Sequence, residues 1–338
     1  MTMETPFLTS IIQKVAEQIG AVVLVDPECP FVGLITFKNG NKTFFRTSRF
    51  SINSSGSVAI AKDKGVSSFF LNKFGYKVTE GKTFFSEELC EEVANCRNID
   101  AGFSYAKELG FPVIVKPLNL SQGVFVTKVY NKQEYYQVAK KILQKISGFI
   151  VERFYNGNDY RIVVLDDEVV SAYQRIPLFI MGDGQSNVLE LMQQKQENFI
   201  KNGRKEIIDF EDYRIKKNLR RRKLNFNSVI PKNNIVYLLD NANLSTGGEA
   251  IDFTENIHPD FQKLAVSITK DMELRLAGVD ILTSDLTLPI VDYTILEVNG
   301  APSLTHYASF GEVQMKRVEN LYLKVLKALE NENNREKH

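Results

Sequence analysis

Short β-rich stretches separated by turns fill the first sixty residues. Branched and aromatic side chains concentrate in three of them, at residues 22–25, 33–37 and 42–45. Such stretches are typical of strands, and Asn39-Gly40 between the last two favours a tight hairpin turn. Apolar residues at helical spacing over 59–75 then predict a short helix that ends near Gly75.

The segment between residues 110 and 176 predicts more strands around one helix. Strands are expected at 112–116, 124–129 and 149–154, and 161–175 is expected to form a hairpin that turns at Asp166-Asp167. The helix is predicted over 132–146, because apolar side chains recur there every three or four residues, at Tyr135, Val138, Ile142 and Ile146.

The C-terminal third predicts two helices and two strands. The helices are expected at 259–276 and around 318–329, and the strands at 278–285 and 293–300. No periodicity assigns the polar stretch 200–232, and the tail 331–338 is expected to fray. Because strands pair as hairpins rather than alternating with helices, the sequence predicts an α+β fold.

Composition and charge exclude several classes of protein. The 338 residues are 43% hydrophobic and 25% charged, which is typical of a globular chain. Lys and Arg number 42 against 41 Asp and Glu, so overall charge attracts neither nucleic acid nor an anionic membrane. No long apolar run predicts a membrane span, and no secretory signal is recognised, so we expect a cytoplasmic protein.

The first candidate site is a cluster of oxygen donors on the last two strands. Glu297 and Asn299 are two residues apart and point to one face of a strand, and Asp280 on the preceding strand can face them. Two carboxylates and an amide oxygen suit Mg²⁺. A solvated hairpin face is the alternative, and Asp285 competes with Asp280 because the register is unknown.

The second candidate site is Lys116, which ends an apolar strand and precedes the polar loop 119–123. A lysine beside backbone N–H donors suits phosphate binding, although a lysine that only extends to solvent fits equally well. In the third, Val151, Glu152 and Phe154 lead to a turn that carries Asp159 and Arg161. Its backbone and carboxylate could bind a nucleoside, but its composition is also that of an ordinary turn.

The order of these pieces is more specific than any one of them. Asp63-Lys64 is followed by Lys116, by the segment from Glu152 to Arg161, and by the cluster at 280–299. Together they resemble the ATP-grasp ligase family over roughly residues 60–327. Residues 241–248, 175–191 and 278–281 are similar to the ATP-grasp module of cyanophycin synthetase. They also resemble the related modules of glutathione-forming enzymes and of the ligase that adds glutamate to a ribosomal protein.

The resemblance implies an ATP-grasp fold, in which two α+β subdomains clamp ATP, here after a small N-terminal α/β unit. The implied boundaries are 1–60 for that unit, 61–110 for a helical linker, 111–175 for the lid, 176–330 for the metal-bearing subdomain and 331–338 for the tail.

The resemblance also implies a role for each candidate residue. The ATP ligands would be Lys64, Lys116, Gln122, Gly123, Val151, Glu152, Phe154 and Asp159. Arg161 and Arg175 would be catalytic and face phosphates. Two Mg²⁺ ions, or Mn²⁺, would be held by Asp280, Glu297 and Asn299. Six other residues would contact the substrate, namely Asn241, Asn243, Ser245, Gly247, Ser303 and His306.

The implied activity is ATP-dependent, ADP-forming ligation of a carboxylate to an amine through an acyl phosphate. An amino acid or short peptide is the expected substrate. One alternative is an enzyme of the same fold that forms amides or esters on a ribosomal precursor peptide, and another is an ATP-binding regulatory module without catalysis. The protein could also form a homo-oligomer.

Some features depart from the family or stay unassigned. Ser303 follows Pro302 where relatives commonly carry glycine, and the second ligase half of cyanophycin synthetase is not expected in this chain. The run 214–223 holds seven basic residues in ten. It fits a solvated helix face or a contact with an acidic substrate better than nucleic acid. Cys29, Cys90 and Cys96 are expected to be reduced thiols.

Overall fold

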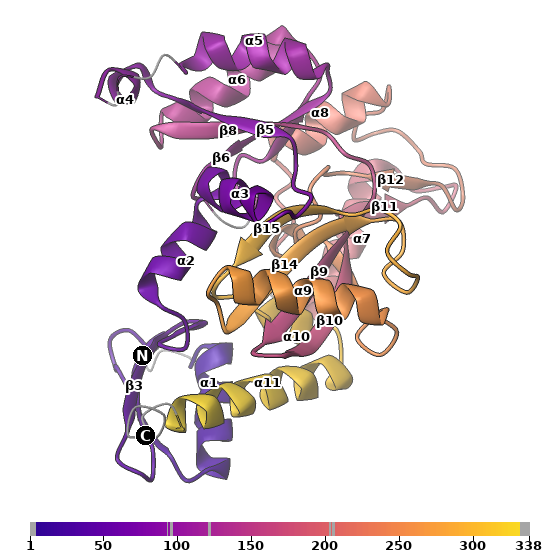
Figure 1. Cartoon of the computed structure of the whole chain (residues 1–338). Coiled ribbons are helices and arrows are strands. Elements are labelled where there is room, and N and C mark those ends of the chain that lie inside the picture. The colour runs from indigo at the N-terminus through magenta and orange to yellow at the C-terminus, as the bar shows by residue number, and fades with distance from the viewer. Residues whose placement is uncertain are drawn as a thin grey trace.

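The structure is a computed structural model, and it describes residues 5–92, 94, 97–120, 123–202, 204 and 207–331. Gln122, Cys96 and most of the expected tail lie outside the described residues. Figure 1 shows an elongated arrangement, with an N-terminal sheet at one end, a large central sheet, and a smaller sheet under α5 and α6 at the other end. The α+β architecture agrees with the prediction.

The N-terminal unit is a four-stranded antiparallel sheet, and its predicted strands are confirmed. Its members pair in chain order, as β1 (Val22–Val25), β2 (Val32–Thr36), β3 (Lys42–Arg46) and β4 (Arg49–Phe50). One face packs on α1 (Phe7–Gln18), which the sequence pattern did not reveal. The same core includes α11 (Glu312–Glu330), so the unit is completed by the predicted C-terminal helix.

Two helices replace the single one predicted over 59–75. They are α2 (Ser55–Lys62) and α3 (Lys64–Lys73), and between them Asp63 adopts an extended backbone. The Asp63 carboxylate accepts hydrogen bonds from the N–H groups of Gly65 and Val66 at 2.9 and 3.0 Å. Asp63 therefore caps α3, and Lys64 becomes the first residue of that helix.

The lid is a second antiparallel sheet of order β5-β8-β6-β7. Its strands are β5 (Gly81–Phe85), β6 (Val113–Pro117), β7 (Thr127–Val129) and β8 (Gly148–Arg153), and its helices are α4 (Glu87–Glu92), α5 (Ile99–Leu109) and α6 (Lys132–Leu143). The helices α5 and α6 pack on the sheet around Phe84, Tyr135 and Phe149. The strand predicted over 124–129 is shorter, because Gly123 and Phe125 have positive φ angles.

The central sheet includes a hairpin that the sequence analysis grouped with the lid. Its order is β13-β10-β9-β14-β15, and all pairs are antiparallel. The strands are β9 (Asn158–Leu165), β10 (Glu168–Ile176), β13 (Glu249–Asp252), β14 (Leu276–Thr283) and β15 (Thr294–Asn299). The hairpin β9–β10, which we had assigned to the lid, pairs with β14 along all of β9. Ile162 and Val164 share a core there with Val279, so burial places the hairpin with the metal-bearing subdomain.

The rest of the C-terminal subdomain surrounds this sheet. The helix α9 (Pro259–Asp271) covers one face, as predicted. An insertion between β10 and β13 builds its own core from α7 (Val188–Lys201), α8 (Tyr213–Arg221), β11 (Phe179–Met181) and β12 (Ile235–Tyr237). The unassigned stretch 200–232 thus contributes α8. Among the described residues, every helix is too short or too polar to cross a membrane.

Candidate active site

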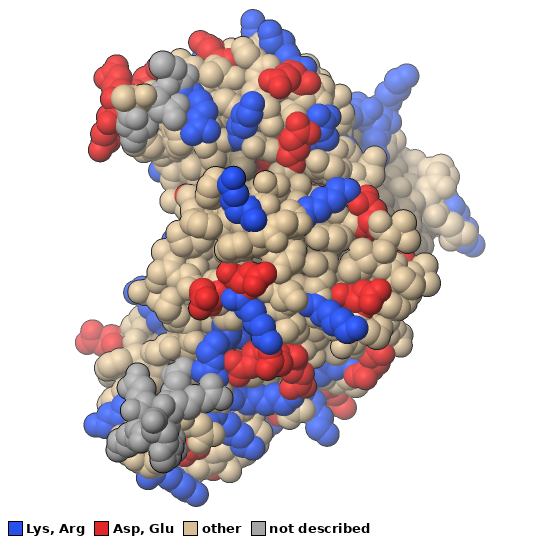
Figure 2. Space-filling view, in the orientation of Figure 1, with Lys and Arg blue, Asp and Glu red and all other residues tan. Residues whose placement is uncertain are grey.

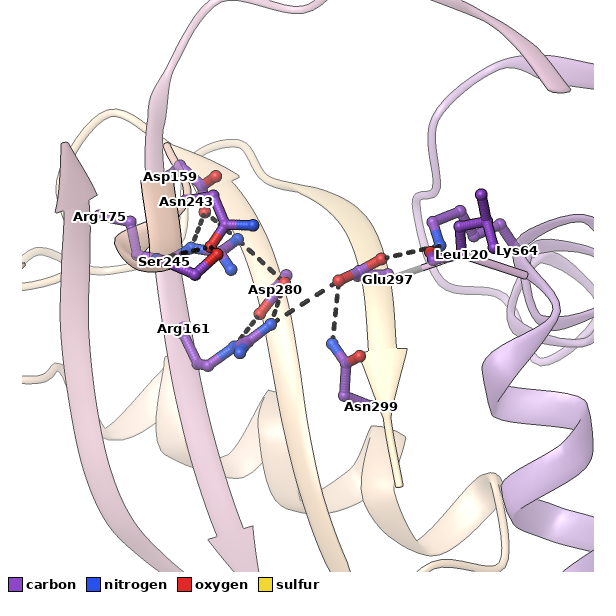
Figure 3. Close-up of polar contacts among 10 residues, drawn as sticks. All are labelled: Lys64, Leu120, Asp159, Arg161, Arg175, Asn243, Ser245, Asp280, Glu297 and Asn299. Carbon is purple, nitrogen blue, oxygen red and sulfur yellow. Dashed lines mark hydrogen bonds and ion pairs between the residues drawn. The ribbon is translucent and has the colours of Figure 1, made fainter. Parts of the chain in front are cut away.

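A row of charged side chains crosses the face of the central sheet opposite α9 (Figure 3). Asp280 on β14 lies directly opposite Glu297 on β15 and opposite Arg161 on β9. Asn299 lies two residues beyond Glu297, and its Nδ2 donates to Glu297 Oε1 at 3.0 Å. The structure therefore brings together the three side chains that the sequence analysis proposed as metal ligands.

The strand register places Asp280 in this row and leaves Asp285, the alternative metal ligand, outside it. Asp285 lies in the loop after β14, where its Oδ1 accepts hydrogen bonds from the backbone N–H and the hydroxyl of Thr287 at 2.8 and 2.7 Å. It thus stabilises its own turn. Since Asp280 is paired with Glu297 in the sheet, Asp280 fits the proposed site and Asp285 does not.

The donor set of this row fits a hard cation. Within the described part of the chain, no three His, Cys, Asp or Glu side chains gather as a metal cluster on their own. The candidate donors are therefore the carboxylates of Asp280 and Glu297 and the amide oxygen of Asn299. Oxygen donors in this small number are typical of Mg²⁺ sites that also use substrate phosphates.

Two arginines orient Asp280. Arg161 donates from Nε to Asp280 Oδ1 at 2.6 Å and from Nη2 to Oδ2 at 2.7 Å. Arg175 Nη2 lies 2.9 Å from Asp280 Oδ2 and 2.7 Å from Asp159 Oδ1. Bidentate pairing fixes the plane of a carboxylate. Both predicted catalytic arginines and the predicted ribose ligand Asp159 therefore belong to this network.

The surroundings shift the pKa values of the acids in opposite directions. Burial raises the pKa of Asp159 to about 6, and Asp280 adds to this rise while Arg175 opposes it. Burial would also raise the pKa of Glu297, but Lys64 and Arg161 together lower it well below its usual range. Both carboxylates are therefore mainly charged at neutral pH, and Glu297 keeps its charge into strongly acidic solution.

The two predicted phosphate lysines enter from the lid side. Lys64 Nζ donates to the carbonyl of Leu120 at 3.0 Å and lies 3.5 Å from Glu297 Oε2. Lys116 Nζ pairs with Glu152 Oε2 at 2.8 Å, and both side chains are buried. Lys64 thus connects the loop of the lid to the last strand of the central sheet.

The loop after Lys116 lies against the loop that was predicted to border the substrate. Gly123 has a φ of +67°, and a Cβ there would come within 2.5 Å of Asn241 Nδ2. Nδ2 of Asn241 is buried without a hydrogen-bond partner among the described atoms. Since only glycine allows this close approach, Gly123 sets the distance between the two loops.

The loop 241–248 ends beside the arginine network. Asn243 Oδ1 accepts hydrogen bonds from the N–H and the hydroxyl of Ser245 at 3.1 and 3.0 Å. Gly247 has a φ of +90° and ends the short 3-10 helix Leu244–Thr246. The chain then enters β13, whose first residue pairs with Ile176, next to Arg175.

Val151 and Phe154, both predicted ATP ligands, lie in β8 and directly after it. Val151 is fully buried in the lid core, and its strand is paired with β5 on one side and β6 on the other. The ring of Phe154 is covered by Lys128 Nζ at 3.3 Å from the ring centroid. Sequence reasoning missed Lys128, because its contact with Phe154 joins two strands that are distant in the sequence.

Two of the predicted substrate residues follow β15. Ser303 is exposed, and His306 lies on the short helix α10 (Thr305–Ala308). The neighbour Tyr307, which the sequence analysis did not single out, stacks on Tyr173 with ring centroids 4.6 Å apart. Tyr173 lies opposite Arg161 in the sheet, so this aromatic pair is on the same face as the arginine network and beside it.

The basic run 214–223 turns largely toward the lid. Arg221 Nη2 and Lys217 Nζ lie 2.6 and 2.9 Å from Glu134 on α6. Arg221 also covers the ring of Tyr130. Helix α8 therefore joins the C-terminal subdomain to the lid, and several of its charges are used within the chain rather than left for an acidic substrate.

Two family models match the chain. The D-ala D-ala ligase C-terminus model matches residues 70–211, and the RimK-like ATP-grasp domain model matches residues 240–318. The chain is 37% identical to cyanophycin synthetase of Nostoc over 202 residues, 57% of this chain and 22% of that protein. It is 30% identical to a glutathione biosynthesis bifunctional protein of Mannheimia succiniciproducens over 280 residues, 79% of this chain and 34% of that protein.

A solved structure shows the same fold. The bifunctional glutathione synthetase of Pasteurella multocida superposes with a TM-score of 0.58 at 24% identity, over 93% of this chain and 44% of that one. The chain thus spans between a fifth and a half of the length of these relatives. With both family models matched in sequence order, the chain belongs to the ATP-grasp family, and the predicted fold is confirmed.

Proposed function

We propose that the protein is an ATP-dependent, ADP-forming carboxylate–amine ligase. The observation that carries the proposal is the arrangement of Lys64, Glu297 and Asp280. The first residue of α3 reaches an oxygen-donor set on the central sheet, and the arginine network surrounds that set. This is the distribution of charge that transfer of a phosphoryl group requires.

The chemistry begins with a carboxylate, which is a poor electrophile at neutral pH. Attack of a substrate carboxylate oxygen on the γ-phosphorus of ATP forms an acyl phosphate and releases ADP. An amine nitrogen then attacks the acyl carbon, loses a proton and expels inorganic phosphate. Neither step needs a nucleophilic Ser or Cys.

The residues of the chain would bind and align these groups. Lys64 on α3 and Lys116 on the lid strand β6 would compensate phosphate charge from one side, and Arg161 and Arg175 would do so from the central sheet. Asp159 would accept hydrogen bonds from the ribose hydroxyls. Gly123 and the loop 241–248 would close over the phosphates and exclude water, which would otherwise hydrolyse the acyl phosphate.

The residues that would hold Mg²⁺ are Asp280, Glu297 and Asn299, with Mn²⁺ as the other candidate ion. The ion would neutralise charge on the phosphate oxygens during transfer. The substrate is expected to be an amino acid or a short peptide, because relatives named cyanophycin synthetase and glutathione biosynthesis protein act in amino-acid chemistry. We also propose that the protein acts in the cytoplasm.

The test is ATP-dependent phosphate release with Mg²⁺, measured against pooled amino acids and dipeptides, with mass spectrometry of the products. We expect release to require a substrate pool, and a product equal to the two reactants minus one water. Glu297→Gln is expected to abolish both signals. The matched control is Asp285→Asn, which removes a nearby acid outside the site.

The possible outcomes are distinct. Stimulation by a long peptide but by no small molecule would keep the ligase chemistry and change the substrate class. Binding of ATP with no phosphate release from any mixture, including peptides, would overturn the proposal in favour of a regulatory nucleotide-binding role.

A further inference from the structure

The outer face of the N-terminal sheet exposes large apolar side chains. Its inner face packs on α1 and α11, as Figure 1 shows. On the outer face, Val22, Leu24 and Phe44 are 69%, 69% and 70% exposed. Large apolar side chains exposed together on a sheet are typical of an interaction surface.

The register arranges this face in three rows of three residues. Leu24, Leu34 and Phe44 lie directly opposite one another and form the middle row. Val22, Thr36 and Lys42 form one flanking row. Val32 and Arg46 are opposite each other in the other, and Asp26 joins them because its N–H donates to the carbonyl of Val32.

Charge is distributed unevenly across these rows. The β3 side carries Lys42 and Arg46, and Arg49 on β4 lies directly opposite Arg46. The β1 side carries Asp26. Like charges in directly opposite positions destabilise a sheet. Among the described residues, no carboxylate forms an ion pair with any of these three cations.

We propose that this outer face binds the same face of a second copy of the chain, related by a two-fold axis parallel to the strands. This rotation places β1 of one copy over β3 of the other. The rows Leu24–Leu34–Phe44 then stack on each other, and Asp26 of each copy meets Arg46 of its partner. The face is therefore self-complementary in shape and in charge, as a two-fold interface requires.

The size of the face predicts the strength of the dimer. Three rows of three residues are fewer than the roughly 20–30 residues that each side of a standard interface contributes. We therefore expect a weak dimer that forms in the micromolar range. Pairing through the open edge of β1 is the other geometry available, but it would leave Phe44 and Arg46 without a role.

The experiment is sedimentation equilibrium of the full chain from about 1 to 200 μM, which spans the range for weak complexes. The variants are Asp26→Arg, Arg46→Asp and an equimolar mixture of the two. Each variant alone should raise the dissociation constant more than about tenfold, because two like-charge contacts replace two favourable ones. The mixture should dimerise like the wild type, because both contacts are again between opposite charges.

Two further variants guard against misfolding and against an unrelated interface. Asp26 also accepts hydrogen bonds from the N–H groups of Glu28 and Cys29, so Phe44→Glu provides a second disruption that leaves this turn intact. Val291→Glu is the matched control, since Val291 is 94% exposed and far from this sheet in the sequence. Thermal melting and ATP binding report on the fold of each variant.

Each outcome decides the proposal. Loss of the dimer in each single variant, with recovery in the mixture, supports it. A wild type that stays monomeric to 200 μM overturns it. A dimer that survives Arg46→Asp and Phe44→Glu assigns the interface to another surface, such as the edge of β1, and also overturns it.

Discussion

Asp280 and Glu297 face each other across the β14–β15 pair and share Arg161, while Glu297 also meets a cation from outside the sheet. Asp280 is held by Arg161 on β9 and Arg175 on β10 of the same sheet. Glu297 lies 3.5 Å from Lys64, whose Nζ also binds the carbonyl of Leu120 in the lid loop. Asp280 is thus held within the sheet, whereas Glu297 also contacts a lysine that binds the lid loop.

Substitution of either acid should therefore strongly reduce catalysis. Asp280→Asn and Glu297→Gln keep the shape of the side chain but remove a charged oxygen donor. We expect kcat for phosphate release to fall by roughly 100-fold or more, a typical loss for one electrostatic group in an active site. Asp285→Asn should stay near wild type. Equal losses in Asp285→Asn and Asp280→Asn would contradict the register-based choice of Asp280.

Removal of Lys116 should affect stability as well as ATP binding. Lys116 and Glu152 are a buried pair, with side chains only 8% and 4% exposed. Lys116→Met leaves the Glu152 charge uncompensated, which we expect to cost ~3–5 kcal/mol in the free energy of unfolding by urea. The double variant Lys116→Met/Glu152→Gln should recover most of this stability without recovering ATP affinity. A double variant no more stable than Lys116→Met would show that the pair is not a unit.

ATP affinity should depend on pH through Asp159. Its pKa is raised to about 6, so the carboxylate that would accept the ribose hydroxyls is charged above that pH and neutral below it. We expect ATP affinity, measured by calorimetry between pH 5 and 8, to fall as the pH drops through about 6. The nucleotide also titrates in this range, so the informative quantity is the difference from Asp159→Asn. Identical pH profiles for the two proteins would exclude Asp159 as the titrating group.

The effect of the close contact between Gly123 and Asn241 on ATP binding can be measured by comparison with a second glycine, Gly40. Gly123 and Gly40 both have positive φ angles, but a Cβ at Gly40 meets no atom within 4 Å. Both alanine variants should lose about 1–2 kcal/mol of stability, the cost of a left-handed backbone for a residue with a Cβ. Only Gly123→Ala should also raise the KM for ATP, because it forces the two loops apart. If Gly40→Ala raised KM equally, the contact would not be the cause.

Periodic segments made much of the fold predictable. The strand pair that carries Asp280 and Glu297 and the hairpin turn at Asp166-Asp167 stand where the pattern of branched residues put them. Helix α1 was missed although its buried residues Ile11, Ile12 and Val15 have helical spacing. Its N-terminus has no side-chain cap to mark it, since Pro6 makes no capping hydrogen bond.

The sequence was sufficient to predict which residues form the site, but not which side chains they contact. Local sequence placed Glu297 and Asn299 on one face, because strand geometry depends on spacing alone. The contacts of Arg175 with Asp159 and Asp280 depend on the order of strands in the sheet, and so does the pairing of β9 and β10 with that sheet. Arg221 with Glu134 could not be anticipated, because 87 positions separate the two residues and no motif connects them.

The packing of α1 on α11 has a consequence for synthesis of the chain. Lys14 contacts Glu319, 305 positions later, and the core between the two helices joins residues almost as distant. During translation, the apolar face of α1 leaves the ribosome long before its partner helix exists. Until α11 has been synthesised, this face depends on temporary protection from solvent, for example by a chaperone. Nascent chains stalled before residue 312 should therefore be especially sensitive to proteases near their N-terminus.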